Sequence, residues 1–183
     1  RVLKQSISLL GYTNKFVIID NEDQKAILKK VYKECKINYE EVSYGTALDI
    51  ISERKVTTED SLVELLRHSP LIKEKYDANA KDLKECTYKD YNTTLKNTIY
   101  YGYLYYQQKS NGLDFNDLII VTVMLFNKNP KILAKWQDRL RYLMVDEFQD
   151  VSQRQFELVK MLSAVHGNLF VVGDPDQTIY SWR

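Results

Sequence analysis

Two clusters of polar side chains directly follow short apolar runs in the last third of the sequence. Asp146 and Glu147 follow the run YLMV, and residues 173–177 follow the run LFVV. A carboxylate that ends a hydrophobic strand is a typical ligand of nucleotide-bound Mg²⁺, because a hard cation prefers oxygen ligands. A second carboxylate beside it can orient or deprotonate an attacking water. The alternative is that both carboxylates simply end a strand in solvent. An apolar run followed by Asp and Glu fits both interpretations equally well.

The segment between the two apolar runs predicts how the clusters meet. Residues 152–166, SQRQFELVKMLSAVH, have the pattern of an amphipathic helix, and Gly167 and Asn168 end it. A helix flanked by two apolar runs is typical of a βαβ unit, and runs without polar alternation fit parallel strands that are buried on both faces. In a parallel sheet, ligands gather at the carboxyl ends of the strands. Both polar clusters are therefore expected at one edge of one sheet.

The start of this helix has two candidate caps. Asp150 precedes the helix and is the preferred N-cap, because a side-chain oxygen there can accept from the first free backbone N–H groups. The alternative is a capping box made by Ser152 and Gln155.

Two strands do not form a stable sheet without further partners. Additional strands must therefore come from sequence outside these 183 residues or from another chain. The unfilled sheet is accordingly expected to be a surface through which this chain can associate.

The first 110 residues are predicted to be helical. Asp20 is placed to cap one helix, Thr57 or Thr58 a second, and residues 88–109 fit one long helix. Its tyrosines recur at helical spacing and are interpreted as core and rim residues of a helical bundle rather than as base-stacking groups. After Asn111 and Gly112, residues 113–128 fit a buried helix and residues 131–141 another. The predicted domains are residues 1–111, all helical, and residues 112–183, part of a parallel α/β domain.

The composition excludes several classes of protein. Apolar residues make up 44% and charged residues 28% of the chain, as in ordinary globular proteins, and the net charge is +1. The two cysteines, Cys35 and Cys86, are far apart and the chain has 2 histidines, which argues against a structural zinc site. Unclustered thiols fit a reducing compartment. No run approaches the roughly 20 apolar residues of a membrane span. We expect an intracellular protein without membrane partners.

The two polar clusters, taken together, resemble a known family. VDEFQD at residues 145–150 is similar to helicase motif II, the Walker B box, of UvrD/Rep-type superfamily 1 DNA helicases. GDPDQTIYSWR at residues 173–183 is similar to motif III, with Thr178 in place of the usual serine. LDFNDLI at residues 113–119 resembles the segment that re-enters the motor domain after an inserted helical domain. FVIIDNEDQKAILKKV at residues 16–31 resembles, more weakly, the start of that insertion.

The resemblance implies a role for each matching residue. Asp146 corresponds to the residue that holds Mg²⁺, and Glu147 to the general base that activates water for attack on the γ-phosphate. Gln177 corresponds to the glutamine that senses this phosphate. Tyr180 and Trp182 correspond to aromatics that stack on single-stranded bases, and stacking of this kind tolerates any base sequence. Arg183 corresponds to the arginine beside these aromatics that couples the nucleotide site to the DNA site.

The resemblance also implies a fold and a set of ligands. The fold would be α/β, with a mostly helical inserted domain over residues 1–111 and an incomplete parallel-sheet P-loop NTPase (RecA-like) motor domain over residues 112–183. The full-length protein would use ATP and Mg²⁺ to move 3′ to 5′ on single-stranded DNA and to unwind duplex DNA in repair or replication. It would act in the cytoplasm at the nucleoid if bacterial, or in the nucleus or a DNA-containing organelle if eukaryotic.

One expected motif is absent from the printed sequence. No G-x-x-x-x-G-K-[ST] loop occurs in the 183 residues, although such a loop supplies most of the grip on the phosphates. The chain also begins without methionine, at Arg1, within an apparent helical pattern. We therefore expect a piece of a helicase that binds no cofactor and hydrolyses no ATP by itself. The alternatives are a non-catalytic DNA-binding helical module, a helical scaffold with relic motor motifs, and part of a RecB/AddA-type helicase-nuclease.

Overall fold

The computed structural model describes residues 1–85 and 90–177. These residues form two compact units that divide between Leu118 and Ile119. The units are described separately below. The predicted domain assignment, residues 1–111 and 112–183, stays a prediction.

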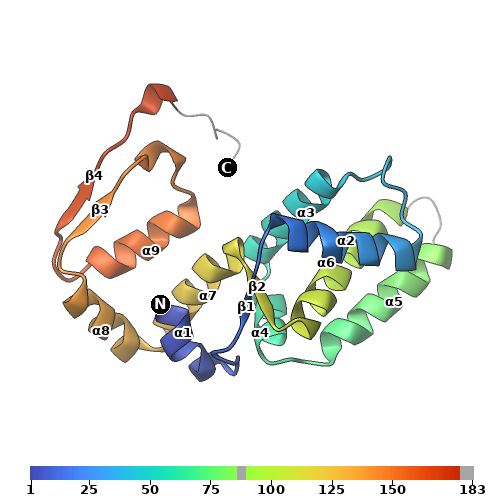
Figure 1. Ribbon diagram of the computed structural model, residues 1–183, viewed down its shortest axis with the longest axis horizontal. Coiled ribbons are helices and arrows are strands. Elements are labelled where there is room, and N and C mark those ends of the chain that lie inside the picture. Colours follow the sequence, from blue (N-terminus) through green and yellow to red (C-terminus); the bar gives the residue numbers. More distant parts are fainter. Residues whose placement is uncertain (86–89, 178–183) are drawn as a thin grey trace. The chain divides into compact units, whose positions relative to one another are not determined.

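The first unit is a bundle of helices with one short pair of strands (Figure 1). Its elements are α1 (Val2–Ser6), the 3-10 helix η1 (Ile7–Leu10), β1 (Val17–Ile19), α2 (Asn21–Cys35), α3 (Tyr44–Thr57), α4 (Glu59–Leu66), α5 (Leu71–Glu85), α6 (Tyr91–Lys109), β2 (Gly112–Asp114) and the start of α7 (Phe115–Lys128). The predicted helices that begin after Asp20 and Thr58 are therefore confirmed, as is the helix that ends at Lys109.

The prediction that helices are the regular structure of the first 110 residues was wrong at one place. Residues 17–19 form β1, which pairs in parallel with β2 so that Val17 faces Gly112 and Ile19 faces Asp114. A strand of three residues is too short to produce a visible alternation of polar and apolar residues. The close approach depends on glycine, because a Cβ at Gly112 would lie 2.4 Å from Ile19 Cδ1.

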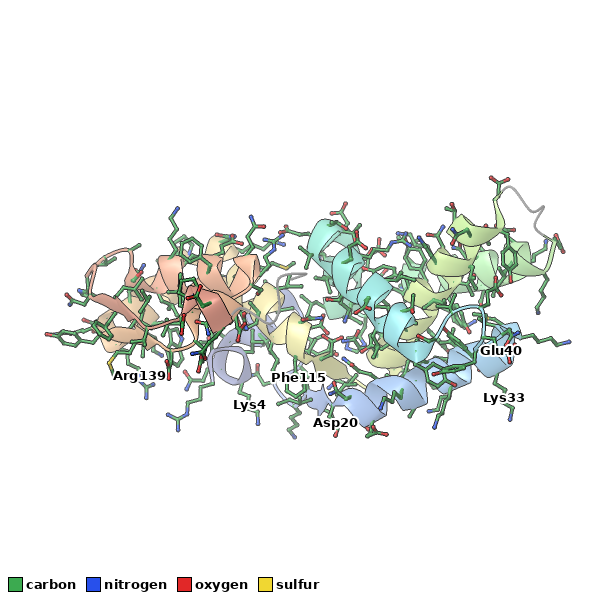
Figure 2. The ribbon with its side chains drawn as sticks, turned by 90° about the horizontal axis from the view of Figure 1, so that it is seen from above. Lys4, Asp20, Lys33, Glu40, Phe115 and Arg139 are labelled. Carbon is green, nitrogen blue, oxygen red and sulfur yellow. The ribbon has the colours of Figure 1, made fainter. Side chains whose placement is uncertain are left out.

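The helix α2 starts at a reciprocal cap. The Asp20 side chain accepts from the backbone N–H of Asp23 at 2.9 Å, and the Asp23 side chain accepts from the backbone N–H of Asp20 at 3.3 Å. Figure 2 shows Asp20 at one end of α2 and Lys33 towards the other. The arrangement satisfies two backbone donors that the helix cannot pair internally. The sequence prediction of Asp20 as a cap is confirmed.

The helix α6 supplies the aromatic core of this unit. Leu95, Ile99, Tyr100 and Tyr103 are 0–2% exposed. Glycine at position 102 lets neighbouring helices approach, because a Cβ there would lie 2.7 Å from Tyr76 Cε2. The interpretation of the tyrosines as bundle residues is confirmed for these positions; Tyr88 lies outside the described residues.

A buried ionic cluster joins α3, α6, β2 and the start of α7. Lys55 Nζ donates to Asp114 Oδ2 at 2.6 Å, to Asp117 Oδ2 at 3.0 Å and to Gln107 Oε1 at 3.0 Å. Tyr103 OH donates to Asp114 Oδ2 at 3.0 Å. Lys55, Gln107 and Asp117 are completely buried, and Asp114 is 1% exposed. One cation is thus shared by two carboxylates inside the protein.

The same two carboxylates also cap α7. Asp114 Oδ1 accepts from the Asp117 N–H at 3.0 Å, and Asp117 Oδ2 accepts from the Asp114 N–H at 2.9 Å. The LDFNDLI segment therefore has a structural explanation, because its two aspartates end β2, start α7 and bind a lysine from α3. Phe115, which lies between the two aspartates in the sequence, is labelled in Figure 2 at the start of α7, and it is 56% exposed.

The cluster should make folding stability depend on pH. Burial and the neighbouring charge of Asp114 raise the pKa of Asp117 from its ordinary 3.8 to about 7. Between these two pKa values, Asp117 is protonated more often in the folded state than in the unfolded state. Its contribution to the free energy of unfolding therefore falls as the pH rises from about 4 to about 7. We expect Asp117→Asn, which has no carboxyl proton to release, to remove this decline. Relative to the variant, the native chain should lose on the order of a few kcal/mol across this window in urea unfolding.

The control for this prediction is Asp49→Asn, because Asp49 is an exposed aspartate on α3. This variant should keep the pH dependence of the native chain. A constant difference in unfolding free energy between the native chain and Asp117→Asn from pH 4 to pH 7 would contradict the prediction.

The second unit contains a βαβ unit (Figure 1, orange to red). Its elements are most of α7, α8 (Pro130–Arg139), β3 (Leu143–Val145), the 3-10 helix η2 (Phe148–Asp150), α9 (Gln153–Ser163), β4 (Leu169–Val171) and the 3-10 helix η3 (Pro175–Gln177). β3 and β4 are parallel, and Met144 faces Phe170 in the register. The predicted strand–helix–strand order and the parallel pairing are confirmed.

The sheet of the second unit keeps much of its apolar surface exposed. Met144 is 81%, Phe170 63% and Val171 43% exposed. Strands of a parallel sheet are ordinarily covered on both faces. Association through this surface stays a prediction.

The described part of the chain forms a mixed α/β structure dominated by helices. Within it, no helix combines the length and apolar character that would let it cross a membrane.

Candidate nucleotide-hydrolysis site

The strand β3 delivers two carboxylates at its carboxyl end. Asp146 and Glu147 directly follow Val145, the last residue of the strand, and both are exposed. The Glu147 N–H donates to Asp146 Oδ1 at 3.0 Å. The structure therefore places these two predicted residues where the sequence pattern expected them, at the end of a parallel strand.

The backbone of Glu147 adopts an unusual conformation. Its φ is 51° and its ψ is 45°, which is the left-handed region. This region costs an ordinary residue roughly 1–2 kcal/mol. Two hydrogen bonds on its C-terminal side hold it: Phe148 N–H donates to Val172 O at 2.9 Å, and Asp150 N–H donates to Glu147 O at 2.9 Å. The main chain thus turns sharply at Glu147 and then runs into η2.

The prediction of Asp150 as the N-cap of the next helix was wrong. Ser152 is the N-cap of α9, and it forms a capping box in which Gln155 Oε1 accepts from the Ser152 N–H at 2.8 Å. Asp150 instead closes η2, two residues too early to reach the first free N–H groups of α9. The alternative capping box is the one that forms.

The strand β4 delivers the second cluster at the same end of the sheet. Asp174 is the centre of this turn: its Oδ1 accepts from the Asp176 N–H at 3.0 Å, and its Oδ2 accepts from Gln177 Nε2 at 2.8 Å. The Gln177 N–H also donates to Asp174 O at 3.0 Å. Gln177 is therefore oriented by Asp174.

A residue that the sequence analysis did not assign connects the two clusters. Gln149 Nε2 donates to Glu147 Oε2 at 2.6 Å, and Gln149 Oε1 accepts from the Asp174 N–H at 3.0 Å. Gly173 makes this contact possible, because a Cβ there would lie 2.6 Å from Gln149 Oε1. The sequence shows that an amide side chain lies two residues after Glu147. Only the pairing of the two strands shows which groups this amide binds.

Asp146 has the chemistry of a magnesium ligand. Its carboxylate is exposed, and no donor among the described residues binds its Oδ2. Mg²⁺ at nucleotide sites is commonly held by one or two carboxylates together with waters and phosphate oxygens. In the described ranges, no group of three or more His, Cys, Asp or Glu could hold a metal ion. A single carboxylate with a free oxygen is compatible with a nucleotide-bound Mg²⁺.

Three predicted site residues lie outside the described residues. They are Tyr180, Trp182 and Arg183. Their assignment to DNA and nucleotide stays a prediction.

Comparison with known proteins identifies the family of the chain. The model of the "UvrD/REP helicase N-terminal domain" family matches residues 1–183. The chain belongs to the UvrD/REP helicase family. Among its relatives, the ATP-dependent DNA helicase PcrA of Staphylococcus aureus is 34% identical over 183 residues, and a DNA helicase II homolog of Mycoplasma capricolum is 37% identical over 187 residues.

These matches cover all of the chain but only part of each relative. The 183 residues span 22% of the length of the S. aureus helicase and 23% of the M. capricolum protein. The ATP-dependent DNA helicase PcrA of Staphylococcus epidermidis is 33% identical, and the chain covers 22% of its length. The UvrD/REP domain described above is therefore about a fifth of the length of the proteins that it resembles.

Proposed function

We propose that this UvrD/REP domain contributes the Mg²⁺-binding and water-activating side of the ATP site in an ATP-dependent DNA helicase. The observation that carries the proposal is the parallel pairing of β3 with β4, which puts Asp146 and Glu147 at the same sheet edge as residues 173–177. Ligands of parallel α/β sheets bind at this edge. The family membership supports a P-loop NTPase, RecA-like fold for the complete motor domain.

Each residue would have a distinct task in hydrolysis. Glu147 accepts a proton from the attacking water, whose oxygen bonds to the γ-phosphorus while the bond to the ADP oxygen breaks. The products are ADP and inorganic phosphate. Asp146 would hold Mg²⁺, which offsets the charge on the phosphate oxygens. Gln177 lies in η3, beyond the end of the neighbouring strand β4, and its amide would contact the γ-phosphate.

DNA is the proposed second ligand. In this proposal Tyr180 and Trp182, shortly after Gln177 in the sequence, stack on single-stranded bases, and Arg183 couples them to the nucleotide. Stacking is worth about 1–3 kcal/mol per base and does not select a sequence. The resemblance of motifs II and III supports translocation from 3′ to 5′ and a role in repair or replication. Unwinding of duplexes with a 3′ tail but not with a 5′ tail would test the direction.

The proposal predicts different activities for this chain and for a longer protein. A protein that contains residues 1–183 and a phosphate-binding loop should hydrolyse ATP faster when single-stranded DNA is added. Residues 1–183 by themselves should show no turnover above background, because they contain no G-x-x-x-x-G-K-[ST] loop. Release of phosphate, measured with and without DNA on the longer protein and on residues 1–183, tests both expectations.

Two results would contradict the proposal. One is the lack of DNA-stimulated hydrolysis in the longer protein. The other is DNA-stimulated turnover by residues 1–183 that disappears in Glu147→Gln.

A further inference from the structure

We propose that Gln149 is a positioning residue that connects the water-activating Glu147 to the phosphate-contacting Gln177. This inference rests on the proposed function. It concerns a side chain that contacts neither nucleotide nor water in the proposed reaction, and that acts through its neighbours.

The connection is a continuous series of hydrogen bonds across the two strand ends. Glu147 Oε2 accepts from Gln149 Nε2 at 2.6 Å, and Gln149 Oε1 accepts from the Asp174 N–H at 3.0 Å. Asp174 Oδ2 then accepts from Gln177 Nε2 at 2.8 Å. The two groups expected to contact water and phosphate are thus joined through two intermediate residues.

A side-chain amide can make both central contacts, because it carries its donor and its acceptor on separate atoms. Its NH₂ donates to the carboxylate of Glu147, and its carbonyl accepts from the Asp174 N–H. A carboxylate at the same position could accept from Asp174 but would face Glu147 with a like charge. Gly173 also fits the connection, since a Cβ there would lie 2.6 Å from Gln149 Oε1.

The consequence of the connection is mechanical. The backbone of Glu147 is in the left-handed region, and its exposed side chain can adopt several rotamers. A hydrogen bond from Gln149 selects the rotamer that faces the β4 side of the site. When Gln177 moves with the phosphate or the DNA, Asp174 and Gln149 can pass that movement to Glu147. Hydrolysis would then be tied to the state of the DNA.

Two substitutions separate the two contacts of Gln149. Gln149→Glu keeps an acceptor for the Asp174 N–H and removes the donor to Glu147. Gln149→Ala removes both. The matched control is Gln153→Glu, because Gln153 is exposed at the first position of α9 and receives the same change of charge.

The first measurement is DNA-stimulated ATPase activity of the full-length protein. Loss of a hydrogen bond to a charged group should lower kcat about 10-fold to 100-fold in both Gln149 variants. The KM for ATP should stay within about twofold, since uniform binding is not affected. Gln153→Glu should match the native protein. The effect of Gln177→Ala should be smaller in Gln149→Ala than in the native protein, because connected residues are not additive.

The second measurement does not depend on activity. In nucleotide-free protein, hydrogen exchange of the Asp174 amide should accelerate in Gln149→Ala but not in Gln149→Glu or Gln153→Glu. A merely structural role would change exchange and melting temperature together and would leave the effects of Gln149 and Gln177 additive.

The possible outcomes distinguish this inference from the proposed function. If the native full-length protein has no DNA-stimulated ATPase, the proposed function fails. If the native protein is active and Gln149→Glu has the same kcat, or if the Asp174 amide exchanges equally in Gln149→Ala and the native protein, the inference about Gln149 is overturned.

Discussion

Replacement of Lys55 by methionine should destabilise the first unit by about 3–5 kcal/mol, the usual cost of removing one partner from a buried ion pair. Lys55 is completely buried and binds both Asp114 and Asp117. Burial by itself would lower the pKa of Lys55, but the two carboxylates outweigh it and raise the pKa. Methionine keeps the approximate length of the lysine side chain and replaces its apolar stem, so the loss of stability reports mainly on the charge. Urea unfolding followed by circular dichroism measures it.

The control for this substitution is Lys25→Met. Lys25 forms an ion pair with Glu22 at 2.9 Å on the surface of α2, where water screens the charges. This variant should unfold close to the native midpoint. The combined variant Lys55→Met, Asp114→Asn, Asp117→Asn should recover part of the lost stability, because no buried charge is left unpaired. Native-like stability of Lys55→Met would show that the cluster does not hold the unit together.

Replacement of Glu147 by glutamine should lower kcat for ATP hydrolysis about 10²-fold to 10⁴-fold in the full-length protein, the range attributed to general acid–base catalysis. Glutamine keeps the size of the side chain but cannot accept the proton of the attacking water. Binding of ATP should persist, because Asp146 and the rest of the site are unchanged. Single-turnover hydrolysis and equilibrium binding of ATP, measured on the same variant, separate the two effects.

The matched control for Glu147 is Glu157→Gln. Glu157 lies on α9 and forms a partly exposed ion pair with Arg154 at 3.0 Å. Its substitution should leave kcat unchanged. An active Glu147→Gln variant would mean that another group takes the proton from water, and the assignment of Glu147 as the base would be wrong.

The sequence predicted the second unit better than the first because its signals are local. Apolar runs on both sides of an amphipathic helix are enough to indicate parallel strands, and β3 and β4 follow that prediction. The cap of α9 shows the limit of such signals. Asp150 and Ser152 are both good N-cap residues, and the choice depended on η2, which uses Asp150 to close a tight turn after Glu147.

The strand β1 and the ionic cluster were not predictable in the same way. β1 has three residues, and its partner β2 lies more than 90 residues later in the chain. Lys55 lies in α3, and no feature of the local sequence separates it from the surface lysines of the other helices. Its burial depends on Asp114 and Asp117, and pairs at that sequence separation leave no local pattern.

The two polar clusters at the strand ends were determined by sequence, since residue type and strand order place Asp146, Glu147 and Gln177 without any long-range information. Tertiary structure decided how these residues are connected. Only the pairing of β3 with β4 brings Asp174 within 3.0 Å of Gln149, and only the left-handed turn at Glu147 directs the chain back towards β4. The physical reason is that a hydrogen bond depends on position within a few tenths of an ångström, which a pattern of residue types does not encode.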